Sequence, residues 1–219
     1  MLSMQVMKYI TPGNFSFLLL FLFACGIFFH WFPPTRPIVI KLTDLFLLLM
    51  NGGVLYFIIR QDQGRRISIW IIFTVLITFL AELAGIRTGN IFGPYLYASG
   101  MHWKVAAVPF VIALNWVVLI LGSWAWAIRI TKIPFLQILL GMLLIVLFDM
   151  ILEPLAMKMD YWQWENGVVP LQNYLAWAII AGFFFLFLKW FNLTFEGKLP
   201  RLFFVVQIIF FLLILLLLP

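Results

Sequence analysis

The sequence predicts an all-α fold, a polytopic membrane bundle of about seven transmembrane helices. Hydrophobic residues make up 65% of the 219 residues and charged residues only 10%, whereas a soluble domain carries roughly 25% charged residues because its surface faces water. The mean hydropathy is +1.12. The apolar residues form long continuous runs and not short alternating ones. In lipid the backbone must form all its hydrogen bonds within the protein, and this pattern favours helices over a β-barrel as the structure that forms them.

Seven apolar segments of helix length follow one another along the chain. Polar clusters and prolines separate them, including the stretch 61–66, Pro134, Pro170 and Pro200. No shift in composition indicates a soluble appendage or a repeat, so we expect residues 1–219 to form a single transmembrane domain. The expected spans are residues 15–33, 38–60, 68–87, 105–128, 134–155, 171–191 and 200–218.

The first apolar run, from Phe15 to Phe32, follows Lys8 in the manner of a secretion signal. No small-x-small cleavage site follows the run, so we expect it to be retained as the first helix. The run contains Cys25, the only cysteine of the chain. A single cysteine excludes an internal disulfide and a cysteine-based metal site.

Lysine and arginine are distributed unevenly between the two sides of the predicted bundle. With seven spans, the N-terminus shares one side with the second, fourth and sixth loops, and this side is the more basic. The positive-inside rule therefore predicts a cytoplasmic N-terminus and an external C-terminus. The net charge of +6 fits loops that face anionic lipid, because no basic run is long enough for nucleic acid. The N-terminal side holds Lys8, Arg60, Arg65, Arg66, Arg129, Lys132, Lys189, Lys198 and Arg201, and the other side holds Arg36, Lys41, Arg87, Lys104 and Lys158.

Four acidic residues lie within or at the ends of the expected spans, where a charge is costly. They are Asp44, Glu82, Asp149 and Glu153. The direction of each helix places all four in the outer half of the membrane, and Asp149 and Glu153 share a helix face. Interfacial water or pairing with nearby basic residues would explain any one of them. Four acids at one depth favour a shared polar chamber, where one of two adjacent carboxyl groups keeps a proton and serves as a general acid.

Two connecting segments on the outer side, 81–97 and 160–177, are rich in aromatic residues. An interfacial aromatic belt would also explain them, but the loops on the other side lack a comparable density. We therefore expect ordered loops that cap the chamber. The aromatic residues concerned are Tyr95 and Tyr97 in the first segment, and Tyr161, Trp162, Trp164, Tyr174 and Trp177 in the second.

Asn115-Trp116 is expected near the middle of the fourth span and Asn51 near the middle of the second. A hydrogen bond between helices would explain either asparagine, and it explains Asn51 more readily. His30 and His102 are too few and too scattered for a metal site. No catalytic triad order, phosphate loop or dinucleotide fingerprint is present in the sequence.

Two further classes of membrane protein are disfavoured. A retinal protein needs a lysine deep in its last span, whereas the run 202–218 contains Gln207 as its polar residue. A proton-coupled transporter would distribute polar groups through both halves of the membrane, whereas the inner half here is almost purely apolar. A site open to one side, or to the lipid, fits this asymmetry better.

Polar, glycine and aromatic residues gather in blocks between residues 82 and 177. The first block comprises Glu82, Gly85, Thr88-Gly89, Phe92-Gly93, Tyr95 and Tyr97. The second comprises Asp149-x-x-x-Glu153-Pro154, Trp162, Trp164, Gly167, Pro170, Asn173 and Trp177, with Asn115-Trp116 between the two. Together these blocks resemble the signature of the bacterial and archaeal carotenoid hydratases, a family of membrane proteins of carotenoid biosynthesis.

This resemblance implies an enzyme that adds water to the terminal isopropylidene double bond of an acyclic carotenoid end group, of the lycopene or γ-carotene type. The product is a tertiary alcohol, and the reaction implies no cofactor and no metal. The partners implied are the carotenoid and membrane lipid, in the cell membrane of a prokaryote. The oligomeric state does not follow from the resemblance.

The residue types suit this chemistry. Protonation of an isolated alkene needs a positioned carboxylic acid in a dry site, and the resulting cation needs electron-rich ring faces nearby. We expect Asp149, Glu153 and Glu82 to divide the acid, base and charge-stabilising roles, with Asp149 or Glu153 as the proton donor. Asp44 and Arg87 are expected to give polar support. The candidate substrate-binding residues are Tyr95, Tyr97, Asn115, Trp116, Trp162, Trp164, Asn173 and Trp177.

Two alternative functions remain open at this point. A membrane carotenoid cyclase of the lycopene type would begin with the same protonation, and a neighbouring double bond would then capture the cation. A non-catalytic carotenoid-binding or transport protein would leave its ligand unchanged. The mass of the product separates the three functions, because hydration adds one water and cyclisation adds nothing.

Overall fold

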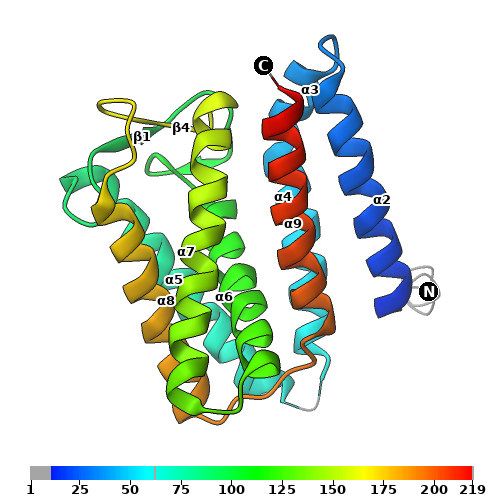
Figure 1. The fold of residues 1–219 in the computed structure, drawn as a ribbon, viewed down its shortest axis with the longest axis vertical. Helices are drawn as coiled ribbons and strands as arrows, with labels where there is room; N and C mark the ends of the chain where they lie inside the picture. Colours follow the sequence, from blue (N-terminus) through cyan, green and yellow to red (C-terminus); the bar gives the residue numbers. More distant parts are fainter. Residues whose placement is uncertain (1–10, 62, 219) are drawn as a thin grey trace.

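The computed structural model describes residues 11–61 and 63–218, which form a bundle of long helices (Figure 1). In this described part, six helices are long and apolar enough to cross a membrane. A seventh apolar helix, α4 (Thr43–Ile59), has 17 residues, which is the lower limit for a span, and follows the short helix α3 (Arg36–Lys41). The expected fold class is confirmed. The six long helices are α2 (Pro12–Trp31), α5 (Gly64–Thr88), α6 (Phe110–Ile130), α7 (Pro134–Lys158), α8 (Leu171–Trp190) and α9 (Lys198–Leu217).

Local sequence signals begin and end several of these helices. The Thr11 side chain accepts the Asn14 backbone N–H at 3.2 Å, and Pro12 occupies the first position of α2. Gly89 ends α5 in a left-handed conformation with φ +66°, and its N–H bonds to the Gly85 carbonyl. Pro134 begins α7 in the same way that Pro12 begins α2.

Helix α6 lies at the centre of the bundle. In the apolar 18-residue stretch of α6, 78% of the residues are buried, against 17–39% in the corresponding stretches of the other five long helices. It packs against α4, α5, α7, α8 and α9, whereas α2 lies at the edge of the bundle and packs mainly on α9 (Figure 1). The approach of α6 to α9 requires Gly122, because a Cβ there would lie 2.8 Å from Cβ of Phe204.

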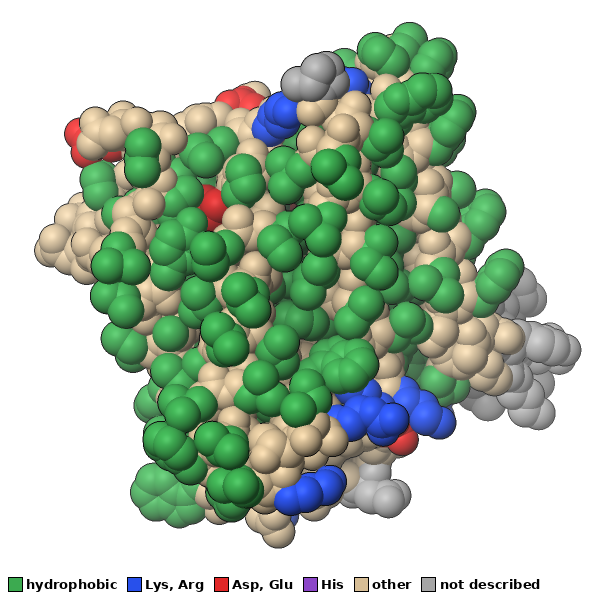
Figure 2. All heavy atoms as spheres, viewed as in Figure 1, with side chains coloured by type: hydrophobic (Ala, Val, Ile, Leu, Met, Phe, Trp, Pro, Cys, Tyr) green, Lys and Arg blue, Asp and Glu red, His purple; other side chains and the backbone are tan. Residues whose placement is uncertain are grey.

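Hydrophobic side chains cover the side wall of the bundle, and basic side chains gather at its two ends (Figure 2). Large apolar residues such as Phe17, Ile69, Leu80 and Ile179 are more than half exposed on this wall. So extensive an apolar surface is unfavourable in water and matches a lipid environment. The chain is therefore a multi-pass membrane protein.

Two small antiparallel sheets lie at one end of the bundle, which we call the cap end (Figure 1). Strand β1 (Tyr95–Tyr97) pairs with β4 (Trp162–Trp164), and β2 (Lys104–Val105) pairs with β3 (Val108–Pro109). Helix α9 ends at the cap end and α2 begins at the opposite end, as seven spans require. Lys8, which we expected on the side where α2 begins, lies outside the described residues.

Three expectations about the helices are corrected. The span expected at 38–60 is divided into α3 and α4. The span expected at 105–128 begins at Phe110, because residues 104–109 form the β2–β3 hairpin, so Asn115 and Trp116 lie in the second turn of α6 and not near its middle. Asn51 is buried, and its side chain has no hydrogen-bond partner among the described residues. The expected hydrogen bond between helices is therefore not formed there.

A candidate active site beneath the β1–β4 sheet

A small pocket of about 30 Å³ lies beneath the β1–β4 sheet, enough for a water molecule. We call it the acid pocket, because Glu82 of α5 and Glu153 of α7 both line it. All eight candidate substrate-binding residues line the same pocket, although they come from two strands and two helices. Its wall comprises Glu82, Phe92, Tyr95, Tyr97, Ile112, Asn115, Trp116, Leu152, Glu153, Trp162, Trp164, Asn173 and Trp177.

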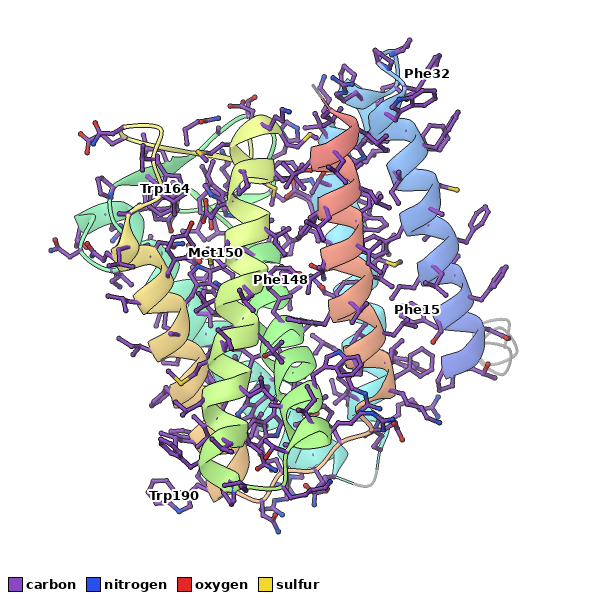
Figure 3. The ribbon with its side chains drawn as sticks, in the orientation of Figure 1. Phe15, Phe32, Phe148, Met150, Trp164 and Trp190 are labelled. Carbon is purple, nitrogen blue, oxygen red and sulfur yellow. The ribbon has the colours of Figure 1, made fainter. Side chains whose placement is uncertain are left out.

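The β1–β4 sheet directs four aromatic side chains into the pocket. Successive residues of a strand point to opposite faces, and the register pairs Tyr95 with Trp164 and Tyr97 with Trp162. These four side chains share the inner face. Leu96 between the two tyrosines is 66% exposed. Figure 3 places Trp164 below β4 at the cap end, far from Trp190 at the opposite end.

Glu82 accepts hydrogen bonds from three neutral donors. Nε1 of Trp116 donates to Oε1 at 2.9 Å, and the hydroxyl of Tyr97 donates to Oε2 at 3.0 Å. The hydroxyl of Tyr95 also donates to Oε2. Burial, followed by the charge of Glu82, raises the pKa of Tyr95 and of Tyr97 above the usual value for a phenol. Both phenols therefore remain donors at neutral pH.

Glu153 is held by two indole groups. Nε1 of Trp162 donates to Oε2 at 2.9 Å, and Nε1 of Trp164 donates to the same oxygen at 2.7 Å. Oε1 has one long contact, at 3.4 Å from Nδ2 of Asn173. One oxygen of Glu153 is thus fully engaged, and the other is comparatively free.

Asp149 lies one helical turn before Glu153 on α7 and is fully buried. Its Oδ2 accepts a hydrogen bond of 2.6 Å from Nδ2 of Asn173, the amide that also contacts Glu153. Its Oδ1 has no partner among the described residues. Asp149 does not line the acid pocket. It shares the Asn173 amide with Glu153.

Asp44 does not join the other three acids. Its Oδ2 accepts the backbone N–H groups of His102 at 2.6 Å and Trp103 at 3.2 Å, so it anchors the loop before β2. Asp44 belongs to α4 and does not line the acid pocket. The chamber that we expected for four acids is therefore a pocket lined by Glu82 and Glu153, with Asp149 next to Glu153 through the Asn173 amide.

Arg87 is exposed in the last turn of α5. It lies five positions after Glu82, which turns its side chain about 140° around the helix relative to that of Glu82. Within residues 11–61 and 63–218 it forms no ion pair with the buried acids. The structure therefore does not place Arg87 as polar support for the site.

Two glycines of the predicted signature allow the close packing around the pocket. A Cβ at Gly85 would lie 2.7 Å from Cδ2 of Phe92. Gly93 has φ +104°, and a Cβ there would lie 2.5 Å from Cγ of Pro170. A side chain at either position would displace the segments that carry the aromatic wall.

Three apolar residues of the wall were not among the predicted substrate-binding residues, namely Phe92, Ile112 and Leu152. Gln207 of α9 was predicted only as the polar residue of an apolar span, whereas its Nε2 donates to Oδ1 of Asn115 at 3.4 Å. A lone glutamine in an apolar span was the signal that could have indicated this contact, because polar side chains in membrane helices usually face other helices.

The fold and this pocket define a multi-pass membrane protein with three buried acids beneath an aromatic cap. The carotenoid biosynthesis protein family matches residues 43–218, which include every residue of the acid pocket. The chain belongs to this family.

The chain is also similar to bisanhydrobacterioruberin hydratase of Haloarcula japonica, with 24% identity over 123 residues. The aligned part is 52% of this chain and 42% of the relative, so the chain spans less than half the length of that curated protein. No solved structure matches the chain.

Proposed function

We propose that this protein is a carotenoid hydratase that acts on acyclic end groups of the lycopene or γ-carotene type. The observation that carries the proposal is the acid pocket, where Glu153 and Glu82 meet aromatic rings in a space large enough for water. Membership of the carotenoid biosynthesis family and the similarity to a protein named as a hydratase support it.

The reaction needs one proton and one water. A carboxylic acid donates its proton to the CH carbon of the terminal isopropylidene double bond. The π electrons form the new C–H bond and leave a tertiary cation on the dimethyl carbon. Water adds to this cation, and the oxygen then loses a proton to a carboxylate. The sum is the addition of one water without oxidation or reduction, and the proton donor is regenerated.

Glu153 is the best candidate for the proton donor. It lines the pocket, whereas Asp149 does not. Because its Oε2 already accepts two indole N–H groups, a proton on Glu153 belongs on Oε1. After the transfer, the Glu153 carboxylate accepts the proton that the added water releases. Asp149 is a positioning residue that acts on Glu153 through Asn173.

Glu82 and the aromatic rings are assigned to the cation. Three donors already occupy the oxygens of Glu82, so it is a poor base, and as a carboxylate it would place a negative charge beside the pocket. The rings of Trp116 and Trp177 stack at a centroid distance of 3.8 Å and form one wall. Ring faces stabilise a nearby cation through their quadrupole.

Incubation of the purified protein with an acyclic carotenoid tests the function directly. We expect a product heavier than the substrate by one water, and no such product from Glu153→Gln. An isomer of unchanged mass would identify a cyclase instead. Recovery of unchanged substrate would indicate a protein that only binds or transports carotenoid.

We also propose that the protein lies in the cell membrane of a prokaryote, with the cap end outside. The positive-inside rule supports this orientation, because the end opposite the cap is the more basic. The acid pocket then lies in the outer half of the membrane. The basic residues at the opposite end are Arg60, Arg65, Arg66, Arg129, Lys132, Lys189, Lys198 and Arg201.

A further inference from the structure

A second cavity, of about 250 Å³, lies between α2, α4, α7 and α9. We call it the large cavity. Apolar side chains from all four helices line it, including Leu22, Leu47, Leu155 and Phe210. It is about eight times the volume of the acid pocket, from 250 and 30 Å³. An apolar group that is too large for the acid pocket therefore has room in the large cavity.

The two cavities have a common wall. Ile112, Asn115, Leu152 and Trp162 line both of them. Trp162 is one of the two tryptophans that donate a hydrogen bond to Glu153. A linear ligand in the large cavity would therefore bring one end to a side chain that contacts the proposed proton donor.

Resting on the proposed function, we infer that the large cavity binds the polyene chain of the carotenoid, with the reacting end at this common wall. A conjugated polyene is linear, rigid and apolar, and it loses little conformational entropy when it binds. Phe23, Phe46 and Phe211 add aromatic surface to the wall. Only the small end group then has to reach the acid pocket.

The hydrogen bonds of the polar groups in the large cavity agree with a polyene whose reacting end lies at the common wall. Nδ1 of His30 bonds to the Gly26 carbonyl at 2.7 Å, and the hydroxyls of Thr43 and Tyr161 bond to each other at 2.9 Å. Oε1 of Gln207 is buried and has no partner among the described residues.

Since Gln207 also contacts Asn115 of the common wall, this unpaired acceptor lies beside the proposed reacting end. It fits the O–H group of a water or of the product alcohol. The apolar remainder of the large cavity is available to the polyene chain of the carotenoid.

Binding of an achiral acyclic polyene to the full-length protein tests this inference. Such a polyene acquires circular dichroism in its visible band only when a chiral site holds it. We would measure the affinity in the Glu153→Gln background, where the proposed reaction cannot consume the ligand. Cys25→Phe on α2 and Leu47→Phe on α4 each fill the large cavity from a different helix. We expect each to lower the affinity about tenfold or more.

Two matched controls place the same phenylalanine outside the cavity. Ala24→Phe and Leu49→Phe lie on the same two helices at exposed positions, and we expect the parent affinity from both. Size-exclusion elution verifies that each variant is folded, and variants on two helices keep the test decisive if one of them misfolds.

Equal affinity in the cavity variants and the controls would overturn the inference, as would the lack of an induced signal in every protein. These outcomes are distinct from failure of the proposed function. If binding follows the expected pattern but the wild type forms no hydrated product, the hydratase proposal fails and the large cavity remains the binding site. If a hydrated product forms but cavity filling leaves the affinity unchanged, the hydratase proposal stands and this inference fails.

Discussion

At the scale of single residues, neutral donors surround Glu82 and Glu153, and no cation among the described residues forms an ion pair with either acid. Two tyrosines and three tryptophans donate to Glu82 and Glu153. Neutral donors fix the position of a carboxyl group without pairing its charge. This arrangement leaves an acid available for proton transfer in a site where a salt bridge would hold it ionised.

The first prediction concerns the proton donor. Glu153→Gln should lower the rate of hydration about 100-fold or more, because an amide cannot donate the proton to the alkene. Product formation by the purified protein measures this rate. Glu165→Gln, an exposed acid in the same connecting segment, should keep the wild-type rate. A near-normal rate in Glu153→Gln would remove Glu153 from the mechanism.

Asp149→Asn separates a positioning role from simple packing. If Asp149 acts on Glu153 through Asn173, loss of its carboxyl group should change the shape of the pH–rate profile, because neighbouring acidic groups influence each other's protonation. If Asp149→Asn only loosened the packing, the rate would fall by the same factor at every pH and the profile would keep its wild-type shape. That result would contradict the assigned role.

A second prediction follows from the two phenols. The folded state holds the protons of Tyr95 and Tyr97 more tightly than the unfolded chain, because burial and the charge of Glu82 raise their pKa. Above pH ~10 the unfolded chain releases these protons and the folded chain keeps them, so the free energy of unfolding falls as the pH rises. Thermal unfolding on both sides of pH ~10 measures the decline.

Tyr95→Phe should be less stable than the wild type by about 1–3 kcal/mol, because it removes a donor from a buried carboxylate. Its free energy of unfolding should also decline less steeply with pH. An equally steep decline in Tyr95→Phe and Tyr97→Phe would exclude these phenols as its cause.

Most residues that line the acid pocket were among the candidates predicted from the sequence, but the hydrogen bonds between them could not be predicted. Acids in apolar spans are conspicuous because they are costly, and Glu82, Asp149 and Glu153 stood out for that reason. Depth in the membrane also grouped Asp44 with them. Position around the bundle depends on helix packing, which depth does not reveal, and Asp44 bonds to the loop before β2 instead.

At the scale of elements, the β1–β4 sheet closes the site. It joins the segment after α5 to the segment after α7, and its register sets the inward direction of all four aromatic side chains. The sequence predicted aromatic loops at this level but not their pairing. Three-residue strands are too short for a period to be recognised, and their partners are far apart in the chain.

The third prediction tests whether Gly93, just before β1, is needed for the packing around this sheet. Gly93→Ala should destabilise the protein by about 1–3 kcal/mol, because φ +104° is unfavourable for alanine and the new Cβ meets Pro170. A lower midpoint of thermal unfolding measures the loss. Gly52→Ala is the matched control on α4, where a Cβ meets nothing within 4 Å, and it should be neutral or slightly stabilising. Equal midpoints for the two variants would contradict this account of Gly93.

At the scale of the whole molecule, the site lies at one end of a bundle whose remaining wall is apolar. The succession of apolar segments predicted about seven spans, because a helix needs a long apolar segment to cross lipid. It could not predict that α6 is central, since a buried span and a lipid-facing span are similarly apolar. The hydropathy of α6 falls within the range of the other spans, although it is by far the most buried.

The fourth prediction concerns orientation. In a Cys25→Ala background, Glu165→Cys at the cap end should react with a membrane-impermeant maleimide in intact cells. Lys132→Cys at the opposite end should react only after the membrane is opened, because the more basic end faces the cytoplasm. The reverse pattern would place the cap end, and with it the acid pocket, on the cytoplasmic side.

The central claim is that a carboxylic acid of the acid pocket protonates the substrate and that water then adds to the cation. Turnover of an acyclic carotenoid in deuterated water tests it most directly, since the proton of a carboxyl group exchanges with solvent. We predict a tertiary alcohol that carries one carbon-bound deuterium, next to the carbinol carbon, at each reacted end, and no such product from Glu153→Gln. A hydroxylated product without carbon-bound deuterium would contradict the claim, because its hydroxyl group would not have come from protonation and hydration of the double bond.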